Sequence, residues 1–231
     1  MKANAVHVWT ARPAQVAPPQ WAGLESLLDR HEAAQADRFR FDEDRCAYVL
    51  AHALRRQALA SALGVSPYDL HFGADASGKP FMLSPVPCDL QFSHSHTRRA
   101  VAVAVTRAGP VGIDIELLGD AWSHDELLEP FIESADTGCF HAQWTTLEAF
   151  WKAQGKGLDT ANPRIRISSA DDGSMDISLA ARSQARGARA VGHPLDLQAD
   201  CAATVVLLQP RTHTMHPPEI LRQPPFSQER R

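Results

Sequence analysis

Two short segments carry carboxylates and a basic side chain at spacings that could assemble a site for an anionic substrate. In the first, VGIDIE, Asp114 and Glu116 are two residues apart. The period of a strand places both carboxylates on one face, opposite Val111, Ile113 and Ile115. Two oxygen ligands on one rigid strand are a suitable beginning for a magnesium site.

The second segment, WTTLEAFWKAQGKGL, supplies Glu148 and Lys152. On a helix these two residues are four positions apart and share one face. Magnesium prefers oxygen donors in octahedral geometry, and waters and substrate phosphates fill the positions that protein carboxylates leave. Glu148 is therefore the natural third ligand beside Asp114 and Glu116, and Lys152 is a basic group that can face the substrate.

Spacing alone leaves a purely structural interpretation of both segments open. An isolated Glu148–Lys152 pair at i,i+4 is more often an ordinary ion pair on a helix surface. Asp114 and Glu116 could equally belong to the solvated face of a strand. The residues by themselves do not decide between a metal site and two charged surfaces.

Two helices are expected around these residues. Over 42–63 apolar residues recur at helical spacing, acidic residues occupy the first turn, and Gly64 is placed to end the helix. Over 144–154 the residues are helix formers, and Gly155 and Gly157 close the segment. The second chemical segment is therefore expected on a helix.

Alternating apolar residues predict several strands, which makes the overall pattern α+β. The predicted strands span 100–105, 111–117, 164–168, 175–179 and 202–208, and a short turn joins the first two. Residues 127–139 look irregular or weakly helical. After Leu208 the chain is rich in proline and has little periodicity, so residues 210–231 are expected to form a disordered tail.

The composition is that of a globular protein, with 231 residues of which 44% are hydrophobic and 22% charged. No apolar stretch reaches the roughly 20 residues of a membrane span, and the first 15 residues lack the apolar region of a signal peptide. We expect a cytoplasmic protein without a membrane partner. The net charge of −4 gives no general attraction to nucleic acid, so any anionic ligand must be held by a local basic cluster.

Together the two segments resemble the two signature motifs of surfactin-type 4'-phosphopantetheinyl transferases. Members of this family carry a GxD(x)E strand and a W(T/S)xKE(A/S)xxKxxGxGL helix. The matching positions are Gly112, Asp114, Glu116, Trp144, Thr145, Glu148, Ala149, Lys152, Gly155, Gly157 and Leu158. Leu147 departs from the motif, because the family usually has a lysine there that is associated with phosphate contact. Leu147 could therefore weaken coenzyme A binding, or Lys152 and Lys156 could compensate.

The resemblance extends over most of residues 36–168. Gly78–Pro80 is similar to the family's GKP turn, and LQFSHSHTRRAVAVAV, residues 90–105, is similar to its FNxSHSxxxVxxA segment. This similarity implies that Lys79, Ser93 and His94 hold the 3'-phosphate of coenzyme A. Such residue types just before a strand are plausible phosphate donors.

Other interpretations of the histidines remain, and the basic helix differs from the family's. His94 and His96 could be an ordinary turn pair or, as His-x-His, part of a zinc site. Ala47 stands where an arginine is usual, so Arg45 is the expected substitute for phosphate contact, with Arg38 and Arg56 as further contributors. His52 on the same helix is left out of the site, because a lone helical histidine more often packs or faces solvent.

The resemblance implies a monomeric pseudo-dimer of two similar α+β halves, residues 1–107 and 108–209, with the coenzyme A site in the cleft between them. It implies transfer of the phosphopantetheine arm of coenzyme A to a serine of an apo acyl or peptidyl carrier protein. Mg²⁺ would bind Asp114, Glu116 and Glu148, Glu148 would double as the base, and Lys152 would stabilise phosphate charge. A non-catalytic module that binds coenzyme A and a carrier protein is the alternative.

Overall fold

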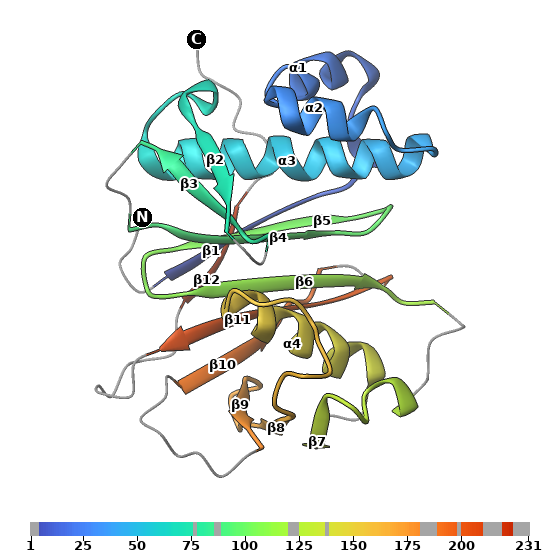
Figure 1. The fold of residues 1–231 in the computed structure, drawn as a ribbon, viewed down its shortest axis with the longest axis vertical. Helices are drawn as coiled ribbons and strands as arrows, with labels where there is room; N and C mark the ends of the chain where they lie inside the picture. The colour runs from blue at the N-terminus through green and yellow to red at the C-terminus, as the bar shows by residue number, and fades with distance from the viewer. Residues whose placement is uncertain are drawn as a thin grey trace.

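The computed structural model describes residues 5–75, 78–85, 89–119, 125–136, 139–180, 189–197, 200–209 and 219–223. These residues form two larger sheets, with one long helix, α3 or α4, packed on the outer side of each (Figure 1). The helices are α1 (Trp21–Glu25), α2 (Arg30–Ala36), α3 (Asp42–Leu63) and α4 (Phe140–Ala153). The predicted α+β class is confirmed.

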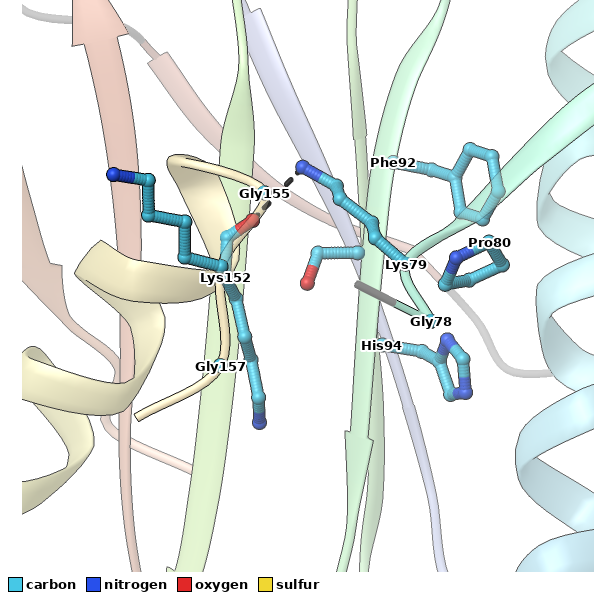
Figure 2. A pocket seen from close by; sticks show the side chains of 10 residues that line it. Gly78, Lys79, Pro80, Phe92, His94, Lys152, Gly155 and Gly157 are labelled. Carbon is cyan, nitrogen blue, oxygen red and sulfur yellow. Dashed lines mark hydrogen bonds between the residues drawn. The ribbon is translucent and has the colours of Figure 1, made fainter. Parts of the chain in front are cut away.

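The first sheet has the strand order β12-β1-β5-β4. Its strands are β1 (Ala5–Ala11), β4 (Gln91–His96), β5 (Val101–Thr106) and β12 (Glu219–Gln223). A separate hairpin of β2 (His71–Ala74) and β3 (Pro80–Ser84) lies beside it. Its loop carries Gly78 and Lys79 toward the boundary between the two sheets (Figure 2).

The second sheet has the order β6-β11-β10-β9-β8-β7. Its strands are β6 (Val111–Leu117), β7 (Ile132–Ala135), β8 (Ile165–Ser169), β9 (Met175–Leu179), β10 (Arg189–Pro194) and β11 (Cys201–Gln209). Helix α4 packs against β6 and β11 at one edge of this sheet. Strand β6, which carries Asp114 and Glu116, is thereby covered by the helix that carries Glu148 and Lys152.

The alternation of alanine and valine in β5 explains how the two sheets meet. Val101, Val103 and Val105 belong to the apolar core under α3, and Ala102 and Ala104 belong to a separate core shared with β6. Small side chains on this second face allow the two sheets to approach closely. Strands β5 and β6 are therefore joined by a short turn, as predicted, but belong to different sheets.

Most predicted elements are confirmed, with shifts at their ends. Helix α3 has the predicted bounds and ends at Gly64, whose φ of 70° suits glycine. Helix α4 begins at Phe140, four residues before the predicted start. The strands predicted at 164–168, 175–179 and 202–208 correspond to β8, β9 and β11. Among the described helices, none combines the length and apolar character needed to cross a membrane.

Three predictions differ from the structure. Ser93 and His94 lie within strand β4 instead of before a strand. The segment 127–139, expected to be irregular or weakly helical, contains strand β7, which pairs in parallel with β8. Residues 219–223, expected to be disordered, form β12 and pair in parallel with β1. Pairing with strands far away in the sequence, which local composition does not encode, accounts for both of the unexpected strands.

Candidate functional site

Helix α4 packs directly against strand β6 at Gly112. A Cβ atom at this position would lie 1.9 Å from the carbonyl oxygen of Ala149 and 2.6 Å from the backbone nitrogen of Ala153. Only glycine leaves room for this approach. The glycine of the VGIDIE segment thus brings the polar face of α4 beside the carboxylates of β6.

Asp114 and Lys152 form the central contact of the site. Asp114 is 3% exposed, and its Oδ1 atom lies 2.5 Å from the Nζ atom of Lys152. Ser95 on β4 joins them, because its Oγ atom donates to Asp114 Oδ1 at 2.9 Å and lies 3.2 Å from Lys152 Nζ. Three separate elements, from both sheets and from α4, therefore meet at one carboxylate oxygen.

Glu116 and Glu148 lie beside this contact and are half-buried. Burial, together with the charge of Asp114, raises the pKa of Glu116, although Lys152 and a hydrogen bond from Trp144 act in the opposite direction. Burial also raises the pKa of Glu148, with Lys152 opposing and Asp114 adding to the rise. Three acidic groups close enough to affect one another form a site that favours a cation.

The donor set fits a magnesium ion that is shared with a substrate. The Oδ2 atom of Asp114 is buried and has no hydrogen-bond partner in the structure, so one carboxylate oxygen is left for a ligand. Across the described residues, no three His, Cys, Asp or Glu side chains converge as a fully protein-bound metal would require. Magnesium usually needs only one or two carboxylates, because substrate phosphates and waters complete its shell.

A pocket of about 210 Å³ lies at the boundary between the two sheets (Figure 2). It is lined by Gly78, Lys79, Pro80, Phe92, Ser93, His94, Lys152, Gly155, Lys156 and Gly157. Five residues singled out from the sequence for coenzyme binding therefore line one pocket: Lys79, Ser93, His94, Lys152 and Lys156. Lys152 also contacts Asp114, so the pocket adjoins the acidic group.

The pocket residues are held by contacts across the boundary. Lys79 Nζ donates to the carbonyl oxygen of Lys152 at 2.8 Å, and burial lowers the pKa of the Lys79 ammonium (Figure 2). Ser93 Oγ accepts the backbone N–H of Ile113 at 3.2 Å. Burial, with the nearby charge of Arg55, lowers the pKa of His94 well below its usual value and so favours the neutral ring. A neutral imidazole still offers one N–H donor to an anion.

Two residues from the sequence interpretation lie elsewhere. Arg45 does not line the pocket, because its guanidinium pairs with Glu25 at 2.7 Å and lies 3.9 Å from Asp37. Leu147 is fully buried in the core of the second sheet and does not line the pocket either. Its side chain packs against apolar neighbours, so the departure from the motif affects the core.

Sequence reasoning missed two contributors to the site, Ser95 and Phe92. Ser95 links Asp114 to Lys152, and the period of two from Ser93 along the same strand was the signal that could have found it. Phe92 lines the pocket. His52 was left out of the site because a helical histidine more often packs or faces solvent, and it does pack: its ring stacks on Tyr48 with centroids 4.0 Å apart and meets the His94 ring edge to face with centroids 5.4 Å apart. No local pattern in the sequence signals that last contact.

The sequence of this chain is similar to those of several known proteins. Residues 12–108 match the family model described as 4'-phosphopantetheinyl transferase, N-terminal. The chain is 32% identical over 166 residues to a 4'-phosphopantetheinyl transferase of Bacillus subtilis, covering 68% of this chain and 73% of that protein. It is 29% identical over 166 residues to the 4'-phosphopantetheinyl transferase HetI of Nostoc sp., covering 66% and 70%.

A third relative is the phosphopantetheinyl transferase of Thraustochytrium sp., 34% identical over 179 residues, which cover 67% of this chain and 62% of that protein. The resemblance to this family is therefore confirmed by relatives that match about two thirds of the chain. The chain belongs to the surfactin-type 4'-phosphopantetheinyl transferase family.

Proposed function

We propose that this chain transfers the 4'-phosphopantetheine arm of coenzyme A to a serine hydroxyl of an apo carrier protein and releases adenosine 3',5'-bisphosphate. Membership of the transferase family supports this activity. The observation that carries the proposal for the site is the Asp114–Lys152 contact, which lies between two further carboxylates and a basic pocket.

Coenzyme A is proposed to bind at the boundary between two similar α+β halves, residues 1–107 and 108–209, in a pseudo-dimer that acts as a monomer in the cytoplasm. Lys79, Ser93 and His94 would hold the 3'-phosphate from the first half. Lys152 and Lys156 would face the pyrophosphate from the second half. All five line the same pocket, which supports this placement. Arg45 would have to break its ion pair with Glu25 before it could contact coenzyme A.

Asp114, Glu116 and Glu148 are proposed to hold a magnesium ion together with substrate phosphates and waters, because the three carboxylates do not converge as a complete protein site would. Mg²⁺ would neutralise charge on the pyrophosphate oxygens and so make the phosphorus a better electrophile. The buried, unpartnered Oδ2 atom of Asp114 supports this assignment. Lys152 carries a positive charge at the same point and would stabilise the charge that develops on the phosphate.

The transfer itself is a displacement at the β-phosphorus. The serine oxygen of the carrier forms a bond to phosphorus as the bond to the adenosine 3',5'-bisphosphate oxygen breaks. The serine proton must leave, and Glu148 is the proposed base, acting directly or through one water. Glu148 is half-buried within the site and is close enough to Asp114 and Lys152 to be affected by their charges, which supports its placement near the reacting groups.

The activity is tested by incubating the chain with coenzyme A and a panel of apo carrier proteins from fatty-acid, polyketide and nonribosomal-peptide systems. We expect release of adenosine 3',5'-bisphosphate with at least one carrier, loss of release on chelation, and recovery with added Mg²⁺. No release with any carrier would refute the proposal.

A thermal shift with coenzyme A tests the alternative, a non-catalytic binding module. Stabilisation by coenzyme A that does not depend on Mg²⁺ would favour that module.

A further inference from the structure

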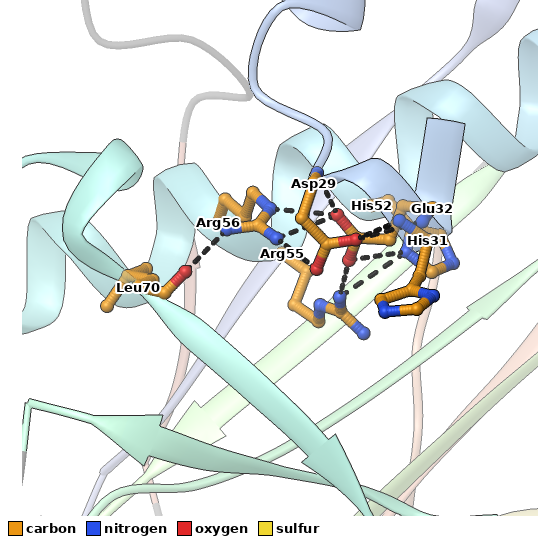
Figure 3. Close-up of polar contacts among 7 residues, drawn as sticks. All are labelled: Asp29, His31, Glu32, His52, Arg55, Arg56 and Leu70. Atoms are coloured by element: carbon orange, nitrogen blue, oxygen red, sulfur yellow. Dashed lines mark hydrogen bonds and ion pairs between the residues drawn. The ribbon is translucent and has the colours of Figure 1, made fainter. Parts of the chain in front are cut away.

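A buried polar cluster joins α2 to α3 (Figure 3). Its centre is Glu32 on α2, which is 7% exposed. The Oε1 atom of Glu32 is 3.0 Å from Nδ1 of His52 and also pairs with Arg55. Its Oε2 atom accepts from Arg56 at 2.7 Å. A single carboxylate thus orients three basic side chains on α3.

Two of these side chains, those of His52 and Arg55, are connected by ring contacts to residues that line the pocket. The ring of His52 meets the ring of His94 edge to face, with centroids 5.4 Å apart and planes at 73°. The Arg55 guanidinium lies 4.1 Å from the centroid of Phe72, and Phe72 meets Phe92 edge to face at 5.8 Å. His94 and Phe92 are both pocket residues. Glu32 is therefore connected to the pocket through two routes.

The charge of Glu32 is stable in this setting. Burial alone would raise its pKa, but the hydrogen bond from His52 and the charge of Arg55 lower the pKa to about 2. A permanently charged carboxylate that accepts from the His52 Nδ1–H holds one ring tautomer and one ring orientation. The ring of His52, itself stacked on Tyr48, then limits the rotation of His94.

We propose that Glu32 and His52 are positioning residues for coenzyme A: Glu32 orients His52, and His52 holds the His94 ring in the orientation that meets the 3'-phosphate. This inference rests on the proposed function, which places that phosphate at His94. Neither Glu32 nor His52 lines the pocket. His52 must therefore act through His94, whereas Glu32 also has the second route, through Arg55 and Phe72 to Phe92.

The test compares the dissociation constants of coenzyme A and of 3'-dephospho-coenzyme A, measured by calorimetry on the full chain. We expect His52→Ala and Glu32→Gln to weaken coenzyme A about three- to tenfold, a size typical of coupling between contacting residues. Binding of the dephospho form should not change, because it lacks the group that His94 contacts. Equal weakening of both ligands, or of neither, would overturn the inference.

Two further comparisons separate positioning from a general loss of structure. Asp29→Asn is the matched control, because Asp29 caps α2 and pairs with Arg56 at 3.0 Å but does not touch His52. It should leave the ratio of the two constants as in the wild type. In a His94→Ala background, His52→Ala should have no further effect on coenzyme A binding. A full effect in that background would contradict the proposal.

The outcomes also distinguish this inference from the proposed function. A wild-type chain that binds coenzyme A but transfers nothing would refute the function, while the ratios of dissociation constants would still decide the role of His52. If Glu32→Gln fails to fold, His52→Ala and His52→Phe carry the test. His52→Phe keeps a ring against His94 and should retain part of the preference for coenzyme A.

Discussion

Gly112 of β6 and Ala149 of α4 are in such close contact that a Cβ atom at position 112 would lie 1.9 Å from the Ala149 carbonyl oxygen. This contact sets the distance between the helix that carries Glu148 and Lys152 and the strand that carries Asp114. The position of the site therefore depends on the absence of one methyl group.

Gly112→Ala should both destabilise the protein and abolish transfer. The obstructing atoms belong to the backbone of α4, so the helix must move, at a cost of about 3 kcal/mol or more, since overpacking a core typically costs about 1–3 kcal/mol. Urea unfolding measures the loss. Gly119→Ala is the control, because no atom lies within 4 Å of its added Cβ, and wild-type stability is expected there. Wild-type stability and activity in Gly112→Ala would contradict this account of the packing.

Lys152→Gln should lower both stability and transfer. The substitution leaves the carboxylate of Asp114, 3% exposed, without its cationic partner. The expected loss is about 1–3 kcal/mol, between the values for exposed and buried ion pairs, because Lys152 is itself partly exposed. Lys152→Arg keeps the positive charge and should recover stability more than activity. The planar guanidinium does not place its charge where the lysine ammonium contacts Asp114 and Ser95. Denaturant unfolding and initial rates of transfer check both variants.

Much of this site could be predicted from the sequence because its parts are local. The period of two paired Asp114 with Glu116, the helical period paired Glu148 with Lys152, and Gly64 correctly ended α3. The contact between the strand that carries Asp114 and the helix that carries Lys152 could not be predicted from local spacing. Its prediction required a family resemblance, because the approach of α4 to β6 at Gly112 depends on residues that are far apart in the chain.

The missed features share the same physical cause. His52 contacts His94, and Ser95 contacts Asp114, only after separate elements have packed together. The burial of Leu147 was not predicted for a related reason, since the motif position shows which residue is usual but not that this side chain is buried here. Strand β12, within the proline-rich segment, owes its conformation to β1.

Leu147→Lys tests whether this departure from the motif affects coenzyme binding or the core. Leu147 is fully buried among apolar residues, so a lysine there should lower the free energy of unfolding and leave the KM for coenzyme A unchanged. Leu147→Met, a swap of similar volume, should cost less than about 1.5 kcal/mol. A stable Leu147→Lys variant with a lower KM for coenzyme A would show instead that the side chain reaches the phosphates.

Glu32→Gln should remove a pH-dependent part of the stability. The pKa of Glu32 is about 2 in the folded protein, below the ordinary value of 4.5. Its contribution is therefore complete above about pH 4.5 and is lost as the pH falls toward 2. Near pH 7 the variant should be less stable by about 3–5 kcal/mol, because Arg55 and Arg56 lose a buried partner.

Denaturant unfolding at several pH values measures this effect of Glu32. The difference between the wild type and Glu32→Gln should be constant above about pH 5 and should shrink below it. Asp29→Asn, which keeps Glu32 and its contact with His52, should show a smaller difference at neutral pH. A difference between the wild type and Glu32→Gln that grows as the pH falls would contradict the assigned direction of the pKa shift.

Asp114 and its neighbours are proposed to transfer the phosphopantetheine arm to a carrier protein. This proposal is tested most directly by the intact mass of an apo carrier after incubation with coenzyme A, Mg²⁺ and either the wild type or Asp114→Asn. We expect the wild type to add the mass of one phosphopantetheine arm, and a folded Asp114→Asn variant to add almost none in the same time. Near wild-type turnover by Asp114→Asn, or no mass gain with the wild type, would contradict it.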